Sequence, residues 1–314
     1  MKVAVCQAAP IPFNVDAGIE KLLNLATNAI ENGAKLIAFG ETFLGGYPIW
    51  LDEAAGAALW DHLGTKSLHN IILKQAIKQD DPRLLPLQQL CDENDVMLSI
   101  GAHERLRNSI YNNQFLMRPK KSMLNHRKLV PTHGERLIWN RGDGSTLNVH
   151  QHDRHVVGNL ICWEHWMPMA RAVMHNMGET IHIAAWPTVR DTYEIASRHY
   201  AFEGRCFVLA AGTVQHRQDL LDGLHSVGGD SAAKELIEQM ADKQLQFGGS
   251  MIIAPDASIL AKAGDKAETI YADLDIDLIG QGLTSLDTDG HYSRADIFDL
   301  RVNISEHNGV TYEK

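Results

Sequence analysis

The chain has 314 residues, of which 45% are hydrophobic and 22% charged, an ordinary globular composition that excludes collagen-like, coiled-coil and disordered classes. Its formal net charge is −10, from 39 acidic and 29 basic residues, and this argues against nucleic acid or an anionic membrane as a partner, because both bind to a basic face. A chain of this length buries enough surface to fold without a disulfide or a metal ion.

Strands and helices alternate in the first half of the chain. Apolar residues over 2–8 predict a buried strand, apolar residues at helical spacing over 14–33 predict a helix, and 36–40 predict a second strand. This order indicates a βαβ unit whose parallel strands are buried on both faces. The other elements predicted in this half are helices over 52–78 and 84–94 and strands over 96–101 and 110–117.

The second half continues the alternation and completes one α/β domain. Helices are predicted over 167–177 and 191–204, and strands over 156–162, 181–185, 206–212, 250–254, 259–261 and 269–273. The polar, glycine-containing segment 217–248 predicts a loop and a helix inserted at the surface. We expect a single domain over 1–300 and a short tail over 301–314. About a dozen strands fit either one large open sheet or two packed sheets with helices outside, and periodicity leaves both open.

The N-terminal residues before Gln7 include only a few apolar ones, so we expect no signal peptide, and no apolar stretch reaches the ~18 residues of a membrane span. Four cysteines, Cys6, Cys91, Cys162 and Cys206, lie far apart without a Cys-X-X-Cys pair, which indicates neither a disulfide framework nor a zinc motif. We therefore expect the reducing cytoplasm, where such a cysteine serves as buried packing or as a nucleophile.

Two polar residues stand at the ends of predicted strands. Glu41 directly follows the strand over 36–40, and in open α/β folds the loops after strand ends build active sites. Taken alone, Glu41 fits equally well a solvated loop carboxylate or a helix N-cap. Cys162 also ends a strand, and backbone N–H groups at such a turn lower the pKa of a thiol and favour the thiolate. The position of Cys162 favours a nucleophile, whereas Cys6 and Cys206 lie inside strands and fit packing.

The segment 126–136 carries the densest charge between the apolar stretches and includes Lys128 and Glu135. Such a run is usually a solvated surface, but a lysine beside carboxylates can also stabilise a developing anion. Together Cys162, Glu41 and Lys128 suit attack on a carbon–nitrogen multiple bond or an amide. The thiolate attacks, the carboxylate moves the proton and activates water, and the ammonium group stabilises the tetrahedral species.

Six segments in order resemble the nitrilase superfamily, and specifically its nitrilase branch. They are residues 39–43 (FGETF), 126–132 (HRKLVPT), 139–145 (WNRGDGS), 160–165 (LICWEH), 203–208 (EGRCFV) and 290–296 (GHYSRAD). The resemblance covers nearly the whole chain. It implies an α/β fold of the nitrilase type, a four-layer α-β-β-α sandwich that pairs into an αββα-αββα dimer, with no cofactor and no metal.

The resemblance also implies the chemistry. Cys162 attacks the carbon of a nitrile, a thioimidate and then a thioester form, and carboxylic acid and ammonia are released. Glu41 matches the general base, Lys128 matches the residue that stabilises the tetrahedral species, and Glu135 matches a second glutamate that orients Lys128. The implied partners are a small-molecule nitrile and water, together with a second copy of the chain in a homodimer or higher homo-oligomer.

The resemblance places five residues near the substrate: Tyr47, Trp163, His165, Trp186 and Pro187. A histidine after Cys-Trp-Glu is similar to arylacetonitrile-hydrolysing and cyanide-hydrolysing members, which favours an arylacetonitrile preference or a broad substrate range.

Other functions stay open on the sequence alone. An amidase, a carbamoylase or a cyanide-hydrolysing enzyme would use the same Cys-Glu-Lys residues. The chain has 16 histidines, and His150, His152 and His155 cluster as a metal site would, although this polar segment fits the exposed tip of a hairpin better. An inactive binding module on the same fold is disfavoured, because none of the four catalytic positions is substituted.

Overall fold

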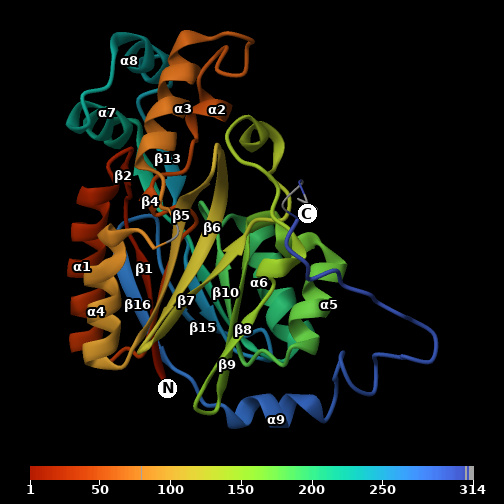
Figure 1. The fold of residues 1–314 in the computed structure, drawn as a ribbon. Coiled ribbons are helices and arrows are strands. Elements are labelled where there is room, and N and C mark those ends of the chain that lie inside the picture. Colours follow the sequence, from red (N-terminus) through yellow and green to blue (C-terminus); the bar gives the residue numbers. More distant parts are fainter. Residues whose placement is uncertain (79, 308–309, 311–314) are drawn as a thin grey trace, which may run out of the picture.

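The computed structural model describes residues 1–78, 80–307 and 310, and two β-sheets packed face to face form its centre (Figure 1). The first sheet has eight strands in the order β16-β1-β3-β5-β4-β2, with β6 paired to β5 and β7 paired to β6. Its strands are β1 (Lys2–Gln7), β2 (Ile11–Pro12), β3 (Leu36–Phe39), β4 (Leu44–Gly45), β5 (Met97–Leu106), β6 (Ser109–Arg118), β7 (Lys121–Arg127) and β16 (Glu268–Asp273). Strands β1, β3 and β5 are parallel, as predicted for the βαβ unit.

The second sheet has six strands in the order β15-β14-β11-β10-β9-β8. Its strands are β8 (Val149–His152), β9 (His155–Ile161), β10 (Ile181–Ala185), β11 (Phe207–Ala211), β14 (Met251–Ile253) and β15 (Ile259–Lys262). Helices α1 (Val15–Glu31) and α4 (Leu85–Asn94) cover the outer face of the first sheet, and α5 (Pro168–Asn176) and α6 (Asp191–Gly204) cover the second (Figure 1). The α-β-β-α sandwich is confirmed, and the single open sheet is wrong.

Aliphatic side chains fill the space between the two sheets. Val5 and Leu36 from the first sheet and Ile183 and Leu209 from the second are fully buried in one cluster. Burying a side chain of this size stabilises the fold by roughly 1.5–3 kcal/mol. The central strands are apolar on both faces, because helices cover the side that does not face the other sheet. This double burial is why they stand out in the sequence as continuous apolar runs.

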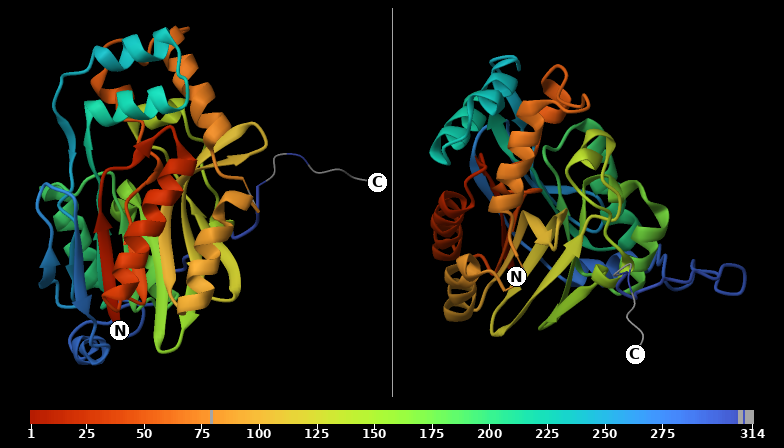
Figure 2. Two further views of the ribbon diagram at one scale, coloured as in Figure 1. Left: turned by 90° about the vertical axis from the view of Figure 1, so that its left-hand side faces the viewer. Right: turned by 45° about the horizontal axis from the view of Figure 1, so that its top comes forward.

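Short helices and a two-stranded ribbon form a cap at one end of the sandwich, the upper end in Figure 1 (Figures 1 and 2). The cap elements are α2 (Trp50–Glu53), α3 (Leu63–Gln75), β12 (Val214–His216), α7 (Arg217–Ser226), α8 (Ser231–Glu238) and β13 (Gln244–Phe247). Leu68 of α3 and Leu236 of α8 are buried in the same apolar cluster. Segment 217–248 thus holds two helices and a strand, in place of the predicted loop and single helix.

Several other elements differ from the sequence-based expectation; the short strands β2, β4 and β12, for example, were not predicted. The helix expected over 52–78 is interrupted between α2 and α3, where Gly56 and Asp61 have φ of 79° and 63°, a conformation that no α-helix contains. Strand β7 was not predicted, because it lies at the edge of the first sheet and most of its residues are polar and partly exposed. It pairs with β6 in a hairpin.

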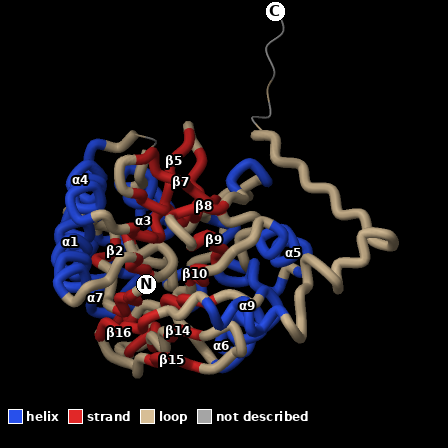
Figure 3. The backbone as a smooth tube through the Cα atoms, turned by 90° about the horizontal axis from the view of Figure 1, so that it is seen from below, coloured by secondary structure: helices blue, strands red, loops and turns tan. Residues whose placement is uncertain are grey.

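The C-terminal part of the chain lies outside the sandwich. Helix α9 (Asp277–Leu283) lies at the end opposite the cap. The short 3₁₀ segments come earlier in the chain and are η1 (Pro82–Leu84), η2 (His133–Leu137), η3 (Gly144–Thr146) and η4 (Cys162–Trp166). After α9 the described residues form an extended segment without helix or strand (Figure 3). Within the described part of the chain, no helix combines the length and the apolar character needed to cross a membrane.

Candidate active site

Glu41 lies in the turn that follows β3, between the two sheets. Its backbone N–H donates to the Trp186 carbonyl at 3.1 Å, which joins the turn to the end of β10 in the other sheet. Gly101 of β5 approaches this turn so closely that a β-carbon there would collide with the backbone from Gly40 to Thr42. Thr42 has a left-handed φ of 48°, an unfavourable conformation for a residue with a branched β-carbon. The close packing of β5 therefore fixes a buried Glu41 in a strained turn.

Lys128 and Glu135 come from the chain just after β7. The Lys128 backbone N–H donates to the Asn112 carbonyl of β6 at 2.8 Å, so the hairpin register sets where the lysine side chain begins. Glu135 stands in η2, and its carboxylate accepts the Thr132 N–H at 2.6 Å. The chain between Lys128 and Glu135 folds back on itself, so that a glutamate seven positions later returns to the lysine side chain.

The ammonium group of Lys128 joins two glutamates. Its Nζ donates to Glu41 Oε1 at 2.8 Å and to Glu135 Oε1 and Oε2 at 3.0 and 2.8 Å. Asn112 donates to the same Glu41 oxygen at 2.5 Å. The second oxygen, Glu41 Oε2, is buried and has no hydrogen-bond partner among the described residues. The three charged side chains are almost completely buried, so their interactions are not weakened by solvent.

Cys162 is held at the start of η4, directly after β9. Its φ of 53° lies in the left-handed region, which is unfavourable for cysteine and places the side chain in a tight turn. The Cys162 sulfur and one carboxylate oxygen each from Glu41 and Glu135 lie within 4.8 Å of one another. The structure thus brings together all four residues predicted to be catalytic. The Cys162 side chain is only 3% exposed.

Glu164 connects the cysteine turn to the lysine segment. Its carboxylate accepts the backbone N–H groups of Ile161 and Leu129 at 2.6 and 2.7 Å, and it contacts His126 Nε2 at 2.9 Å. Ile161 precedes Cys162 and Leu129 follows Lys128, so one buried carboxylate fixes the spacing of both. Burial alone would raise the pKa of Glu164, but His126 and the two N–H donors hold it below its usual 4.5.

The electrostatics of the cluster follow from two carboxylates that share one cation. Burial raises the pKa of Glu41 to about 7, against the opposing effect of Lys128 and with a contribution from Glu135. Burial by itself would lower the pKa of Lys128, but charge on Cys162, Glu41 and Glu135 holds it well above its ordinary 10.5. Lys128 is therefore a permanent cation, and Glu41 can bind and release a proton near neutral pH.

The expectation that the Cys162 thiol would have a lowered pKa is wrong. Burial and the Glu41 charge raise the pKa of Cys162 well above its usual 9.0, and the opposing effects of Lys128 and the Trp163 N–H do not compensate. A thiol with a raised pKa becomes a thiolate only if a base takes its proton as it reacts, and the carboxylates of Glu41 and Glu135 both have an atom within 4.8 Å of the Cys162 sulfur. Of the two, Glu41 has an oxygen without a hydrogen-bond partner among the described residues.

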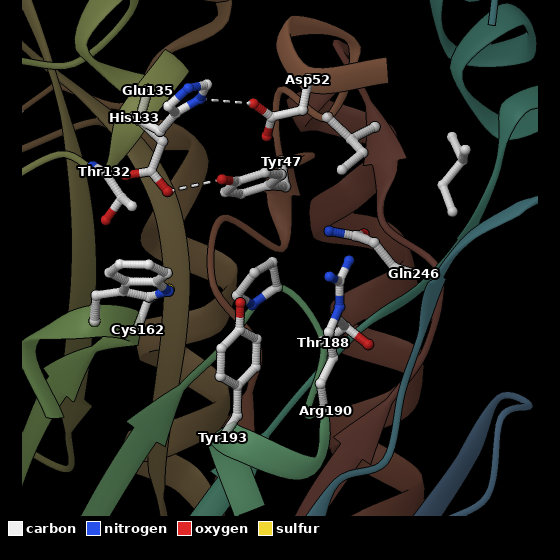
Figure 4. A pocket seen from close by; sticks show the side chains of 14 residues that line it. Tyr47, Asp52, Thr132, His133, Glu135, Cys162, Thr188, Arg190, Tyr193 and Gln246 are labelled. Carbon is white, nitrogen blue, oxygen red and sulfur yellow. Dashed lines mark hydrogen bonds and ion pairs between the residues drawn. The ribbon is translucent and has the colours of Figure 1, made fainter. Parts of the chain in front are cut away.

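A cavity of about 330 Å³ opens onto the cysteine (Figure 4). Its lining residues are Tyr47, Ile49, Asp52, Thr132, His133, Glu135, Cys162, Trp163, Pro187, Thr188, Arg190, Tyr193, Leu245 and Gln246. The Tyr47 hydroxyl donates to Glu135 Oε1 at 2.7 Å, which ties this wall to the charged cluster. Three of the five predicted substrate-binding residues, Tyr47, Trp163 and Pro187, line the cavity.

The other two, His165 and Trp186, lie behind the cavity wall and do not line it. Both are buried, and their rings stack with centroids 4.8 Å apart. The η4 turn directs His165 back into the protein, where its Nδ1 contacts the Cys162 carbonyl at 2.7 Å and its Nε2 contacts His182 Nε2 at 3.0 Å. His182 Nδ1 in turn contacts both oxygens of Glu179, at 2.9 and 3.0 Å. Any effect of His165 on substrate range is therefore transmitted through the cysteine turn.

The histidine cluster occupies the β8–β9 hairpin, as expected, although His150 is buried against Arg118. Within the described residues, the one group of side chains spaced to hold a metal ion is Glu41, Glu135 and Cys162. Lys128 Nζ already bonds both of these carboxylates, so the position between them is filled by a cation of the chain itself. This donor set fits a nucleophilic site better than a metal site.

Sequence reasoning missed several residues of the site. Asn112 is a polar residue inside a buried strand, and because buried polar groups need hydrogen-bond partners, its position could have been used to predict a role in the site. Glu164 stands in a quoted motif and its contact with the Ile161 N–H is local, but no local pattern reveals its contact with the Leu129 N–H, 35 residues earlier. Arg190 and Gln246 of the cavity wall come from the start of α6 and from β13, which only the tertiary fold brings together.

Comparisons with known proteins agree with this geometry. The family model described as "Carbon-nitrogen hydrolase" matches residues 2–282. An aliphatic nitrilase of Sinorhizobium fredii is 36% identical over 308 residues, which are 96% of this chain and 95% of that protein. An arylacetonitrilase of Trametes versicolor is 32% identical over 317 residues, 96% of each chain. A CN-hydrolase superfamily protein of Xanthomonas campestris has the same fold, with a TM-score of 0.70, 12% identity and coverage of 96% of this chain and 99% of that one.

Proposed function

Because this chain belongs to the carbon–nitrogen hydrolase family, and to its nitrilase branch, we propose that it hydrolyses organic nitriles to carboxylic acids and ammonia. One observation carries the proposal: a buried thiol lies beside a glutamate with a free oxygen and a lysine held between two carboxylates, at the base of an open cavity. Each of these groups has a role in adding a thiol and water across a carbon–nitrogen triple bond.

The first stage forms the covalent intermediate. Glu41 takes the thiol proton as Cys162 Sγ bonds to the nitrile carbon, and one π bond of the nitrile breaks toward nitrogen. The proton then passes from Glu41 to that nitrogen and gives a neutral thioimidate. A pKa of about 7 suits both transfers, because Glu41 accepts the proton and returns it without a large energy difference. The Lys128 ammonium group faces the negative charge that develops meanwhile.

The second stage uses two water molecules. Glu41 takes a proton from the first water, which attacks the thioimidate carbon and gives a tetrahedral species stabilised by Lys128. Glu41 returns this proton to the nitrogen. As the carbon–nitrogen bond breaks, the proton of the new hydroxyl group passes through Glu41 to the same nitrogen, so that ammonia leaves and a thioester remains on Cys162. A second water gives a proton to Glu41 and attacks the thioester carbon; the carbon–sulfur bond breaks, the proton returns from Glu41 to the Cys162 sulfur, and the acid is released. Glu135 holds Lys128 in place through two contacts, at 2.8 and 3.0 Å, and needs no change of charge.

The predicted substrate residues divide into two groups. Tyr47, Trp163 and Pro187 line the cavity and contact the substrate in this proposal. His165 and Trp186 act indirectly, by supporting the turn that carries Cys162. Relatives include both an aliphatic nitrilase and an arylacetonitrilase, so the arylacetonitrile preference stays a prediction.

We also propose where the protein acts and how it assembles. Four free cysteines, all buried, fit the reducing cytoplasm. Exposed apolar side chains on the outer helices, Met169 of α5 and Ile195 and Phe202 of α6, fit a homodimer or higher homo-oligomer. Residues 1–300 form one catalytic domain in this proposal, with 217–248 as an insertion and 301–314 as a tail.

Product analysis on matched nitrile and amide pairs tests the function. We expect acid and ammonia from phenylacetonitrile or butyronitrile, and no turnover of phenylacetamide or butyramide, by mass spectrometry with an ammonia assay. Cys162→Ala is the inactive variant, and Cys206→Ala is its matched control, because Cys206 is also buried but stands outside the site. Turnover of the amides alone would contradict the proposal and identify an amidase.

A further inference from the structure

Arg190 brings a positive charge to the wall of the cavity. It is the N-cap residue of α6, its side chain makes no capping hydrogen bond, and it is one of the residues that line the cavity above Cys162. Among the described residues, its guanidinium group has neither an ion-pair partner nor a hydrogen-bond partner. The first N–H groups of α6 add to the positive potential at this point. Arg190 is exposed, so its guanidinium group is open to a molecule that enters the cavity.

Gln246 supplies a second unpaired polar group on the same wall. It lies on β13, is 1% exposed, and its Nε2 has no partner among the described residues, whereas its Oε1 accepts the Thr213 hydroxyl at 2.8 Å. Gln215 stands directly opposite on β12, so it shares this face of the ribbon, and both of its amide atoms are buried without a partner. Buried amide groups are rarely left unpaired in a native protein unless a ligand or water completes them.

The unpaired groups of Arg190 and Gln246 lie away from the reacting atoms. Figure 4 shows the nitrogen-bearing ends of Arg190 and Gln246 on the side of the cavity across from Cys162 and Glu135. Of the acidic side chains of the lining, Glu135 is bound by Lys128, and Asp52 Oδ1 lies 3.4 Å from His133 Nδ1, a contact that is an ion pair only when His133 is protonated. Arg190 is a cation of the lining that no acidic side chain contacts among the described residues, and it lies opposite Cys162 (Figure 4).

We infer that this wall binds a carboxylate of the substrate, and that the enzyme prefers nitriles with a carboxylate at the end remote from the cyano group. The inference rests on the proposed nitrile hydrolysis. Arg190 would bind the two carboxylate oxygens through its fork of N–H donors, and Gln246 Nε2 would donate a further hydrogen bond. A cyano group at Cys162 and a carboxylate at Arg190 would then fix both ends of a short-chain cyano acid.

Matched substrates and variants test this assignment. The ratio of kcat/KM for 4-cyanobutanoate to that for the neutral 5-hydroxypentanenitrile is measured in the wild type, in Arg190→Gln and in Arg198→Gln. Arg198 is the control because it lies on the same helix, faces another surface and pairs with Glu194 at 3.5 Å. We expect the wild type to favour the cyano acid, R190Q to lower the ratio about tenfold, and R198Q to leave it unchanged. Salt should weaken the preference, since Arg190 is partly solvated.

A binding measurement separates this inference from the proposed function. Calorimetric titration of 4-cyanobutanoate into Cys162→Ala and into Cys162→Ala/Arg190→Gln needs no turnover, and the second variant should bind about tenfold more weakly. Hydrolysis of neutral nitriles with equal ratios in all variants would overturn the carboxylate site and leave the nitrilase function intact. Arg190-dependent binding without hydrolysis of any nitrile would support the carboxylate site and contradict the function.

Discussion

A buried chain of hydrogen bonds runs from Glu179 to the turn that carries Cys162, and its hydrogen positions can be worked out. Burial and His182 lower the pKa of His165 to about 3, so His165 is neutral, and its Nδ1 must carry the hydrogen donated to the Cys162 carbonyl. Its Nε2 then accepts a hydrogen from His182 Nε2, which leaves His182 Nδ1 bare opposite Glu179. Glu179 must donate here and is protonated, in agreement with burial raising its pKa to about 7.

Replacing Glu179 with Gln should preserve these hydrogen bonds and remove their titration. The amide nitrogen donates to His182, and the amide oxygen accepts the Tyr200 hydroxyl that contacts Glu179 Oε2 at 2.6 Å. In the wild type the folded pKa of about 7 lies above the ordinary 4.5, so the unfolded chain releases this proton first and stability falls as pH rises from 4.5 to 7. At about 1.4 kcal/mol for each pKa unit, the contribution of Glu179 to the stability of the wild type falls by roughly 2–3 kcal/mol between pH 5 and pH 8.

Urea unfolding of the wild type and E179Q at pH 5 and pH 8 measures this effect. The free energy of unfolding of E179Q, relative to that of the wild type, should be roughly 2–3 kcal/mol more favourable to the folded state at pH 8 than at pH 5. Glu203→Gln is the control, because His175 and Arg171 outweigh burial and lower the pKa of Glu203 to about 2. Glu203 is then largely ionised in both states above pH 5, so E203Q should cost nearly the same free energy at both pH values. A difference between E179Q and the wild type that is equal at the two pH values would refute the assigned hydrogen positions.

The mechanism yields three further expectations. Cys162→Ala should abolish acid and ammonia formation, whereas Cys206→Ala should keep the activity and lose ~1–3 kcal/mol in urea unfolding, since Cys206 is fully buried. Lys128→Met should remove activity and lower the free energy of unfolding by ~3–5 kcal/mol at pH 8, because Glu41 and Glu135 lose a buried cation. This loss of stability should be smaller at pH 5, where the carboxylates bind protons. The kcat/KM of the wild type should fall about tenfold per pH unit below the Glu41 pKa of about 7, because protonated Glu41 cannot accept the thiol proton. A kcat/KM that stays constant down to pH 5 would exclude Glu41 as the base.

The fold was predictable where both faces of an element are buried. Strand β10 has the predicted bounds, Ile181–Ala185, because it is buried along its whole length. Helix α6 also has the predicted bounds, Asp191–Gly204, although it is partly exposed, because an acidic residue begins it and a glycine ends it. The edge strand β7 and the break between α2 and α3 were not predictable, since one depends on pairing with β6 and the other on left-handed residues in a segment of helical composition. Local patterns report burial, but they do not report which distant segment provides it.

The candidate site also has features that could be predicted from the sequence and features that could not. Glu41 and Cys162 each follow a predicted strand, so their positions could be inferred from the sequence, whereas Lys128 was found through its charged segment, since the strand before it was not predicted. The direction of a side chain within a turn could not be inferred, and this is why His165 and Trp186 were expected in the cavity but lie behind its wall. The pKa of the thiol also depends on its depth of burial, which outweighs the N–H groups that the sequence-based argument considered.

In the proposed mechanism, the hydrogen bonds of the two glutamates indicate which of them acts as the base. Both oxygens of Glu135 are occupied, Oε1 by Lys128 and Tyr47 and Oε2 by Lys128 and the Thr132 N–H. Glu41 has both of its donors, Lys128 and Asn112, on Oε1, and Oε2 has none among the described residues. Glu135 thus has no oxygen left without a hydrogen-bond partner, whereas a hydrogen placed on Glu41 Oε2 would meet no competing donor. In the proposed mechanism, Glu135 therefore holds Lys128 in place, and Glu41 carries the proton between sulfur, nitrogen and water.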